Sequence, residues 1–240
     1  MTYCVGLRLD AGLVLLSDTR TNAGIDNVSV YRKMFTFEVP GERAMVLMTA
    51  GNLSVTQTVL AKIRHRMANT EASASESILR AESMLEVAEI FGRTLHQVSL
   101  DINSKMKAME QQASASMLLA GQRRGGQPRL FLIYQQGNFI EATDDTPYLQ
   151  IGEHKYGKPI LDRVVTPATS LEDGRKAALL SMDSTLRSNL SVGMPLDLAI
   201  IPTNEFRIAT HQRIEAGDPT FSQMSEAWSQ TLRDGFANMP

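Results

Sequence analysis

The first fifty residues alternate between apolar and polar positions, which is typical of half-buried β-strands. Residues 3–9 carry apolar side chains at every second position, and residues 13–17 form a second apolar run. The segment between them, Asp10-Ala11-Gly12, has the composition of a tight turn, so the two runs are predicted to pair as a hairpin. Two more strands are predicted at 34–39 and 44–49, each followed by a glycine-containing turn.

The middle of the chain changes to a helical period. Ser73 and Glu76 have the spacing of a capping box, which predicts a helix start. A pair of helices, or one long interrupted helix, is predicted because the apolar positions downstream keep steps of three and four. These positions are Ala81, Leu85, Ala88, Phe91, Leu95, Val98 and Ile102.

Strand patterns return at 116–120, 129–135 and 139–142, and again at 196–201 and 206–210. A second capping box at Thr169 and Glu172 starts a predicted helix, and Asp218-Pro219 starts another. Helices gathered into blocks around antiparallel strands indicate an α+β fold in which helices cover layers of sheet. Because no linker or repeat divides residues 1–240, we expect a single domain.

Composition narrows the classes of protein. The chain is 43% hydrophobic and 21% charged, which indicates a globular protein. Its net charge of −2 gives no general attraction to nucleic acid, and no run of about 18 apolar residues is present to span a membrane. Cys4 is the only cysteine, which excludes a disulfide framework. We therefore expect a soluble cytoplasmic protein without nucleic-acid or membrane partners.

The common catalytic motifs are missing. The sequence has no glycine-rich dinucleotide or phosphate loop, no nucleophile elbow and no zinc-protease motif. Its four histidines, His65, His96, His154 and His211, are scattered, so neither a metal site nor a serine–histidine–aspartate triad has a local signature. No metal and no organic cofactor are expected.

Thr2 is the remaining candidate, because removal of Met1 would leave a hydroxyl and a free α-amine on one residue. An α-amine has a reference pKa of roughly 7.7 to 8, so near neutral pH it can act as the base for its own hydroxyl. Taken alone, however, a threonine at position 2 is more often an ordinary second residue.

The predicted hairpin gives Thr2 an acidic neighbour. If residues 10–12 close a three-residue loop, Cys4 faces Asp18 across the two strands. Thr2 and Asp18 then lie diagonally on the same face, within about 8 Å of each other at Cβ. A shift of one residue in this register would put them on opposite faces. The alternative role of Asp18 is to cap the loop that follows its strand.

Three segments together resemble the proteasome β-subunits and the related bacterial HslV peptidase. A strand leads into residues 18–24, Asp-Thr-Arg-Thr-Asn-Ala-Gly, which resemble the Asp-x-Arg-x-x-x-Gly segment of those families. Arg32-Lys33 is similar to the segment that presents their catalytic lysine, and residues 48–51 resemble the strand end that forms their oxyanion hole. A weaker similarity to motifs further along the family's sequences is found at residues 151–153 and 187–193. The immediate Met-Thr start, without a propeptide, is most similar to the bacterial branch called Anbu, the ancestral β-subunit.

The resemblance implies a four-layer αββα sandwich of two antiparallel sheets, the fold of N-terminal-nucleophile hydrolases. It implies Thr2 as the nucleophile and Lys33 as a buried ammonium that lowers the pKa of the Thr2 amine and hydroxyl. Asp18 would be the counter-ion of Lys33. The Gly51 N–H would stabilise the oxyanion, and Ser191 would position the amine.

The chain departs from the family at two positions near this site. Glu153 stands where a serine is usual, and Ser188 stands where the family has an aspartate close to the nucleophile. Asp183 is the one nearby acid that could replace that aspartate, but its helical position favours a solvent-facing side chain. Thr49, two residues before Gly51, is expected to help set the side-chain preference of the substrate pocket.

The function implied by the resemblance is a threonine-type peptidase or amidohydrolase that acts on peptide or protein substrates. Relatives enclose their sites, so a homo-oligomer is expected, either a ring or an open helical stack; an ATPase unfoldase as a further partner stays open. Two alternatives share the fold. One is an amidase for a specialised peptide-like molecule, and the other is a non-proteolytic assembly protein in which a retained Met1 keeps the Thr2 amine acylated.

Overall fold

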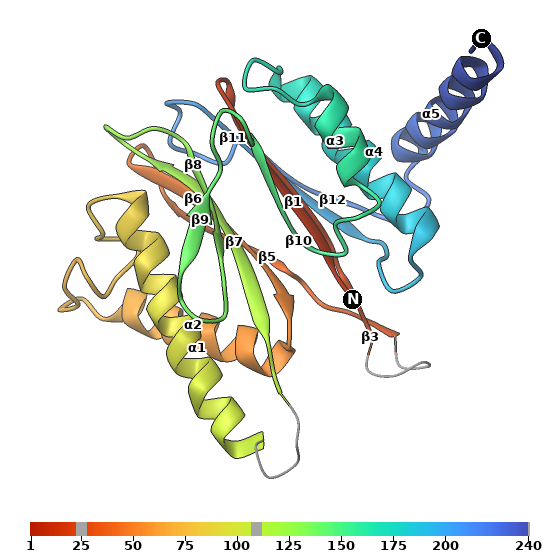
Figure 1. The fold of residues 1–240 in the computed structure, drawn as a ribbon. Helices are drawn as coiled ribbons and strands as arrows, with labels where there is room; N and C mark the ends of the chain where they lie inside the picture. Colours follow the sequence, from red (N-terminus) through yellow and green to blue (C-terminus); the bar gives the residue numbers. More distant parts are fainter. Residues whose placement is uncertain (23–27, 107–111, 240) are drawn as a thin grey trace.

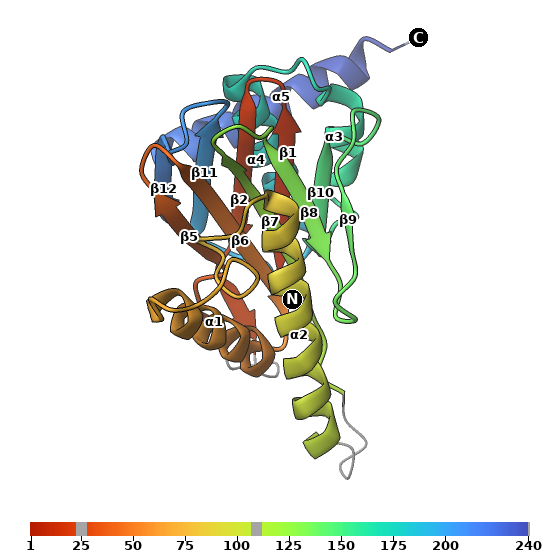
Figure 2. The same cartoon turned by 90° about the vertical axis from the view of Figure 1, so that its left-hand side faces the viewer.

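Two antiparallel sheets pack face to face in the middle of the molecule, and helices cover both outer faces (Figures 1 and 2). The computed structural model describes residues 1–22, 28–106 and 112–239. Within these ranges, the first sheet has the order β10 (Tyr148–Gly152), β1 (Tyr3–Leu9), β2 (Gly12–Asp18), β11 (Leu196–Pro202) and β12 (Thr210–Ile214). The second has the order β5 (Met34–Val39), β6 (Arg43–Gly51), β7 (Ala115–Arg123), β8 (Arg129–Ile133) and β9 (Phe139–Glu141). A short ribbon pairs β3 (Arg20–Asn22) with β4 (Val28–Val30).

The helices form the two outer layers. One layer, α1 (Leu53–Ala68) and α2 (Met84–Met106), packs on the second sheet, and the other, α3 (Lys158–Val164) and α4 (Leu171–Ser188), packs on the first. The C-terminal helix α5 (Pro219–Ala237) contacts α4. The predicted α+β sandwich of two antiparallel sheets is therefore confirmed.

Alternation along β2 shows how the sequence fills these layers. Leu13 and Leu15 point between the two sheets, whereas Val14 and Leu16 belong to the core beneath α3 and α4. All four side chains are fully buried. Both faces of a central strand are covered, which explains a nearly continuous apolar run, and each buried leucine contributes about 1.5–3 kcal/mol.

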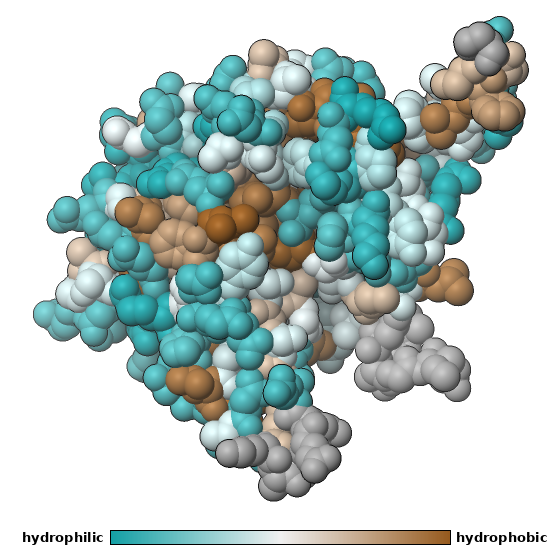
Figure 3. All heavy atoms as spheres, in the orientation of Figure 1, coloured by the Kyte–Doolittle hydropathy of each residue, from teal (hydrophilic) through white to brown (hydrophobic). Residues whose placement is uncertain are grey.

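The helix α5 projects from the body of the molecule, and its outer half carries apolar colour in the space-filling view (Figures 1 and 3). Leu232, Phe236 and Met239 are exposed there, Phe236 to 80%. The helix begins as predicted: Asp218 Oδ1 accepts a hydrogen bond from the Phe221 N–H at 2.8 Å, and Pro219 follows the cap. In the described part of the chain, no helix combines the length and apolar character needed to cross a membrane.

The capping box predicted at Ser73 does not start a helix. The Glu76 carboxylate accepts from the Ser73 N–H at 3.1 Å and from its hydroxyl at 2.8 Å, but this closes only a local turn. Such side-chain bonds to nearby backbone stabilise turns as well as helix ends. The helix itself begins at Met84, and the second predicted box is displaced by one residue, because Ser170 Oγ accepts from the Asp173 N–H.

The strand predicted at 206–210 is wrong. Phe206 has a φ of 51°, which is incompatible with extended backbone, and the strand β12 begins only at Thr210. The strand β10 and the helix α3 were not predicted. Both are short segments whose apolar positions show weak periodicity. The longer strands at 34–39 and 196–201 are predicted correctly.

Candidate active site

Thr2 lies directly before β1, which is paired with β10 on one side and with β2 on the other. The residue is only 8% exposed. Its carbonyl accepts a hydrogen bond from the Glu153 N–H at 2.7 Å, and Gly152 has a φ of 82°. A Cβ on Gly152 would lie 1.9 Å from the Thr2 carbonyl oxygen, so only glycine permits this approach. The sheet therefore fixes the backbone position of Thr2.

The hairpin that brings Asp18 near the N-terminus has a different register from the predicted one. Cys4 pairs with Ser17, and Leu9 pairs with Gly12, so Asp10 and Ala11 form a two-residue loop. The predicted pairing of Cys4 with Asp18 is therefore wrong by one residue, and so is the argument that the strands place Thr2 and Asp18 on one face. A two-residue loop is the commonest hairpin connection.

Asp18 reaches the N-terminus in another way. Its Oδ1 accepts from the Tyr3 N–H at 3.1 Å, and its Oδ2 accepts from the N–H groups of Arg20 and Gly193, both at 3.2 Å. The carboxylate is fully buried. Burial raises the pKa of Asp18, and Lys33 and the N–H groups of Tyr3 and Gly193 act against that rise.

Lys33 enters the site just before β5. Its Nζ donates to Asp18 Oδ1 and to the Arg20 carbonyl, both at 2.6 Å, and to the Met1 carbonyl at 3.4 Å. These three oxygen acceptors satisfy the three donors of the buried ammonium. The Met1 carbonyl belongs to the peptide bond that acylates the Thr2 nitrogen, so Lys33 lies beside the group that processing would convert to an amine.

The second sheet supplies the opposite wall. Gly51 ends β6 with a φ of 104°, and a Cβ there would lie 2.3 Å from the Ser114 carbonyl oxygen. The Thr49 N–H donates to the Lys33 carbonyl at 3.0 Å, which joins this strand end to the lysine segment. An open pocket of about 350 Å³ lies between the sheets and is lined by Thr2, Lys33, Thr49 and Gly51, among others. Asp18 lies behind Lys33 and does not line it.

Ser191 and Ser188 make no hydrogen bond to Thr2 within the described chain. The Ser191 N–H donates to Asn189 Oδ1, and Asn189 Nδ2 donates to Glu153 Oε2, both at 2.9 Å. Ser188 is exposed at the end of α4. Glu153, in the place of the family serine, thus has its side chain anchored by Asn189, while its own backbone N–H donates to the Thr2 carbonyl.

Neither Asn189 nor Gly193 is predicted as a site residue, although both fall in the 187–193 segment that resembles a family motif. A Cβ on Gly193 would lie 2.2 Å from Arg20 Nε, so any side chain there would have to displace this arginine. The Arg20 Nη1 donates to the Leu190 carbonyl at 2.7 Å, which holds this loop over Asp18. Ala23 and Gly24, the last residues of the 18–24 segment, lie outside the described residues.

Asp183 is not solvent-facing, so that expectation is wrong. It is buried on α4 and accepts hydrogen bonds from Ser225 Oγ at 2.7 Å and from Arg187 Nε at 3.1 Å. These contacts attach α5 to α4. Within the described chain Asp183 makes no hydrogen bond to Thr2, so its contacts are structural.

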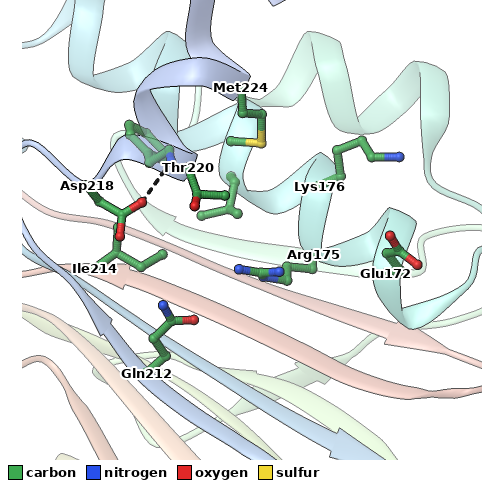
Figure 4. A pocket seen from close by; sticks show the side chains of 10 residues that line it. Glu172, Arg175, Lys176, Gln212, Ile214, Asp218, Thr220 and Met224 are labelled. Atoms are coloured by element: carbon green, nitrogen blue, oxygen red, sulfur yellow. Dashed lines mark hydrogen bonds between the residues drawn. The ribbon is translucent and has the colours of Figure 1, made fainter.

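The N-terminal amine of the chain is electrostatically perturbed by this site. Burial and the Lys33 ammonium lower the pKa of the Met1 amine, while Asp18 and Glu153 partly oppose this effect. A separate groove between α4, β12 and α5 contains Arg175 and Met224 (Figure 4) and none of the predicted site residues.

Comparison with known proteins agrees with this geometry. The proteasome subunit family matches residues 2–201. The structure of Anbu, the ancestral β-subunit, from Yersinia bercovieri is 45% identical, with a TM-score of 0.91, and the match covers 99% of this chain and 97% of that one. The Gly-1 mutant of Anbu from Hyphomicrobium sp. strain MC1 is 44% identical, with a TM-score of 0.93 and coverage of 100% and 98%.

The helical assembly of the Anbu complex from Pseudomonas aeruginosa is also similar, at 44% identity and a TM-score of 0.93, over 99% of this chain and 97% of that one. Curated proteins give no match. The chain belongs to the proteasome subunit family, which confirms the resemblance inferred from its motifs.

Proposed function

We propose that the chain is a threonine-type peptidase or amidohydrolase in which Thr2, freed by removal of Met1, is the nucleophile and its own α-amine is the base. One observation carries this proposal. The buried Lys33–Asp18 ion pair lies against the first residues of the chain, and Thr2, Lys33 and Gly51 line one pocket. A structural ion pair alone would not need to share a pocket with the chain terminus.

In the acylation step, Thr2 Oγ1 attacks the carbonyl carbon of a substrate amide, and its proton passes to the Thr2 amine, directly or through a water. The carbonyl oxygen becomes an oxyanion, for which we assign the Gly51 N–H as donor. When the tetrahedral intermediate collapses, the C–N bond breaks and the protonated amine of Thr2 returns its proton to the leaving nitrogen. The product is an ester on Thr2.

In the deacylation step, the same amine takes a proton from water, whose oxygen attacks the ester carbon. The ester C–O bond then breaks, Thr2 Oγ1 regains a proton, and a carboxylic acid leaves. Lys33 acts through charge in both steps, because an ammonium beside the amine lowers the pKa of that amine and keeps more of it uncharged near neutral pH. Asp18 pairs with the Lys33 ammonium and holds it in place. For Ser191 we propose that it positions the amine. Ser188 and Glu153 belong to the surroundings of the site, where the Glu153 carboxylate opposes the effect of Lys33 on the amine pKa.

We also infer that copies of the chain assemble into a homo-oligomeric ring or open helical stack that encloses these pockets, in the cytoplasm. The similar Pseudomonas aeruginosa Anbu complex forms a helical assembly. Enclosure would limit access to peptides or unfolded segments, so the substrate class would be peptide or protein.

Intact mass spectrometry tests the proposal. Protein from its native host is expected to lack Met1 and to gain the mass of a threonine-directed electrophile, such as a β-lactone. Thr2→Ser is expected to keep the adduct, because it keeps the hydroxyl, and Thr2→Ala is expected to lose it. Retention of Met1 together with an absent adduct would favour the non-proteolytic alternative, and an adduct without peptide cleavage would favour the specialised amidase.

A further inference from the structure

The pocket beside Thr2 has an unusual charge balance. Its charged lining side chains are Arg32 and Lys33, Met1 brings the N-terminal amine to it, and no described carboxylate lines it. The Lys33 ammonium is engaged at 2.6 Å by both Asp18 and the Arg20 carbonyl. Arg32 is exposed, and no ion pair joins it to another described residue. Arg32 is therefore the lining cation that no described acidic residue compensates.

The remaining walls are polar and small. Thr21 and Thr49 contribute hydroxyl-bearing side chains, and no hydrogen bond occupies the Thr49 hydroxyl within the described chain. Leu53 and Ala50 supply the apolar contacts. Thr56 also lines the pocket, but its hydroxyl already donates to the Leu53 carbonyl at 3.1 Å. No described aromatic residue lines the pocket, and apart from Met1, which processing would remove, Leu53 is its one large aliphatic side chain.

We propose that this pocket selects substrates with a carboxylate side chain, glutamate or aspartate, at the residue that precedes the scissile bond, and that Arg32 is the specificity-determining residue. The inference rests on the proposed function of Thr2. A guanidinium matches a carboxylate with two parallel N–H donors, which a lysine cannot do. A cationic substrate side chain would meet the charges of Arg32 and Lys33 without a partner, so the same pocket disfavours lysine and arginine.

Two nearby acids act on the N-terminal amine beside this pocket, but neither lines it. Glu153 does not line the pocket, and its carboxylate is held by Asn189 Nδ2 at 2.9 Å. Asp18 is fully buried behind Lys33 and compensates that ammonium. The charge of Arg32 is therefore the one that a bound side chain would meet.

The experiment uses peptide electrophiles that are identical except for the residue next to the reactive group, which is glutamate, glutamine, leucine or lysine. Adduct formation on the Thr2-exposed protein is followed by intact mass spectrometry. We expect glutamate to react about tenfold faster than its neutral isostere glutamine, a ratio that corresponds to about 1.4 kcal/mol. Added salt is expected to reduce this ratio, because the pocket is open to solvent.

Variants at Arg32 test its assignment. In Arg32→Ala the glutamate-to-glutamine ratio is expected to fall to about one, and in Arg32→Glu the lysine peptide is expected to become the preferred one. Arg233→Ala, which removes an exposed arginine from α5, is expected to keep the wild-type ratio. Equal rates for glutamate and glutamine in the wild type, or a ratio that survives Arg32→Ala, would overturn the inference.

Two further measurements separate this inference from the proposed function. A small electrophile without a side chain labels Thr2 whatever the pocket prefers, so its failure to label the wild type counts against the nucleophile itself. Binding of the non-reactive glutamate and glutamine peptides to Thr2→Ala reports the charge preference without chemistry. Tighter binding of the glutamate peptide supports the inference, and equal binding contradicts it.

Discussion

Lys33 and Asp18 form an ion pair, Nζ to Oδ1 at 2.6 Å, that is buried on both sides, with 6% and 0% of the two side chains exposed. The pair connects the end of β2 to the segment before β5, and so connects the two sheets. Asp18 also accepts from three backbone N–H groups, which satisfies its remaining lone pairs. Such a pair is costly to break, because either partner alone would be left as a buried, uncompensated charge.

Lys33→Met is therefore expected to lower the free energy of unfolding by about 3–5 kcal/mol, measured by urea denaturation at pH 7. The matched control is Lys176→Met, which removes an exposed lysine paired with Asp173 on the same helix. We expect no measurable change there, because exposed pairs contribute little. Equal effects of the two substitutions would show that the buried pair does not stabilise the fold.

Glu153→Gln is expected to lower the pKa of the N-terminal amine. The Glu153 carboxylate is one of the charges that raise the pKa of this amine, so its neutralisation leaves burial and Lys33 less opposed. NMR titration of the amine in the Met1-retaining protein measures the shift. In the processed protein, the rate of adduct formation rises as the amine deprotonates. The acid limb of the pH–rate profile is therefore expected to move to lower pH. Glu172→Gln, on the exposed start of α4, is the control and should leave both curves in place.

Gly152→Ala is expected to displace Thr2. Gly152 and Gly125 share a φ of 82°, but a Cβ on Gly125 meets nothing within 4 Å, whereas a Cβ on Gly152 would lie 1.9 Å from the Thr2 carbonyl oxygen. Gly125→Ala should thus lower the free energy of unfolding by about 1–2 kcal/mol, from backbone strain alone. Gly152→Ala should lower the free energy of unfolding by about 3 kcal/mol or more, measured by urea denaturation. It should also abolish electrophile labelling of Thr2. Identical costs would show that the close approach tolerates a methyl group.

Ser225→Ala is expected to weaken the attachment of α5 to α4. Ser225 Oγ donates to the buried Asp183 carboxylate, and removal of a hydrogen bond to a charged group costs about 1.5–3 kcal/mol. Hydrogen exchange over residues 219–237 should accelerate while exchange in β1 and β2 stays unchanged. Ser229→Ala is the matched control, because its hydroxyl bonds only to the Ser225 carbonyl of its own helix. Protection of α5 that is unaltered in Ser225→Ala would contradict the proposed attachment.

The hairpin shows how far sequence reasoning reaches. The strands and the turn are predictable from alternation and from Asp10-Ala11-Gly12, but the register depends on whether the loop has two residues or three. In the structure Gly12 pairs with Leu9, and Asp18 shifts by one position along β1. Its contact with the N-terminus survives because it is made to the Tyr3 backbone and through Lys33, not through a side-chain pair on one face.

Residues that meet only in three dimensions were the hardest to predict. Asn189 anchors Glu153 across 36 positions, and Gly193 donates to Asp18 across 175. No local period or cap encodes such contacts. The prediction for Asp183 is wrong for the same reason. Its helical position alone predicts a solvent-facing side chain, but α5 packs over that face of α4. In contrast, the chemistry of an N-terminal threonine predicted Thr2, and the family motifs predicted Lys33, Thr49 and Gly51. All four residues line one pocket.

The strand that follows Thr2 is held on both sides, since Tyr3 pairs with Gly152 and Cys4 pairs with both Ile151 and Ser17. The sheet thus fixes Thr2 whatever precedes it. Under the proposed mechanism, a chain that retains Met1 is a zymogen whose inhibitor is one residue long. Folding and activation are then separate events, and an aminopeptidase, not the fold, determines when the hydrolase is switched on.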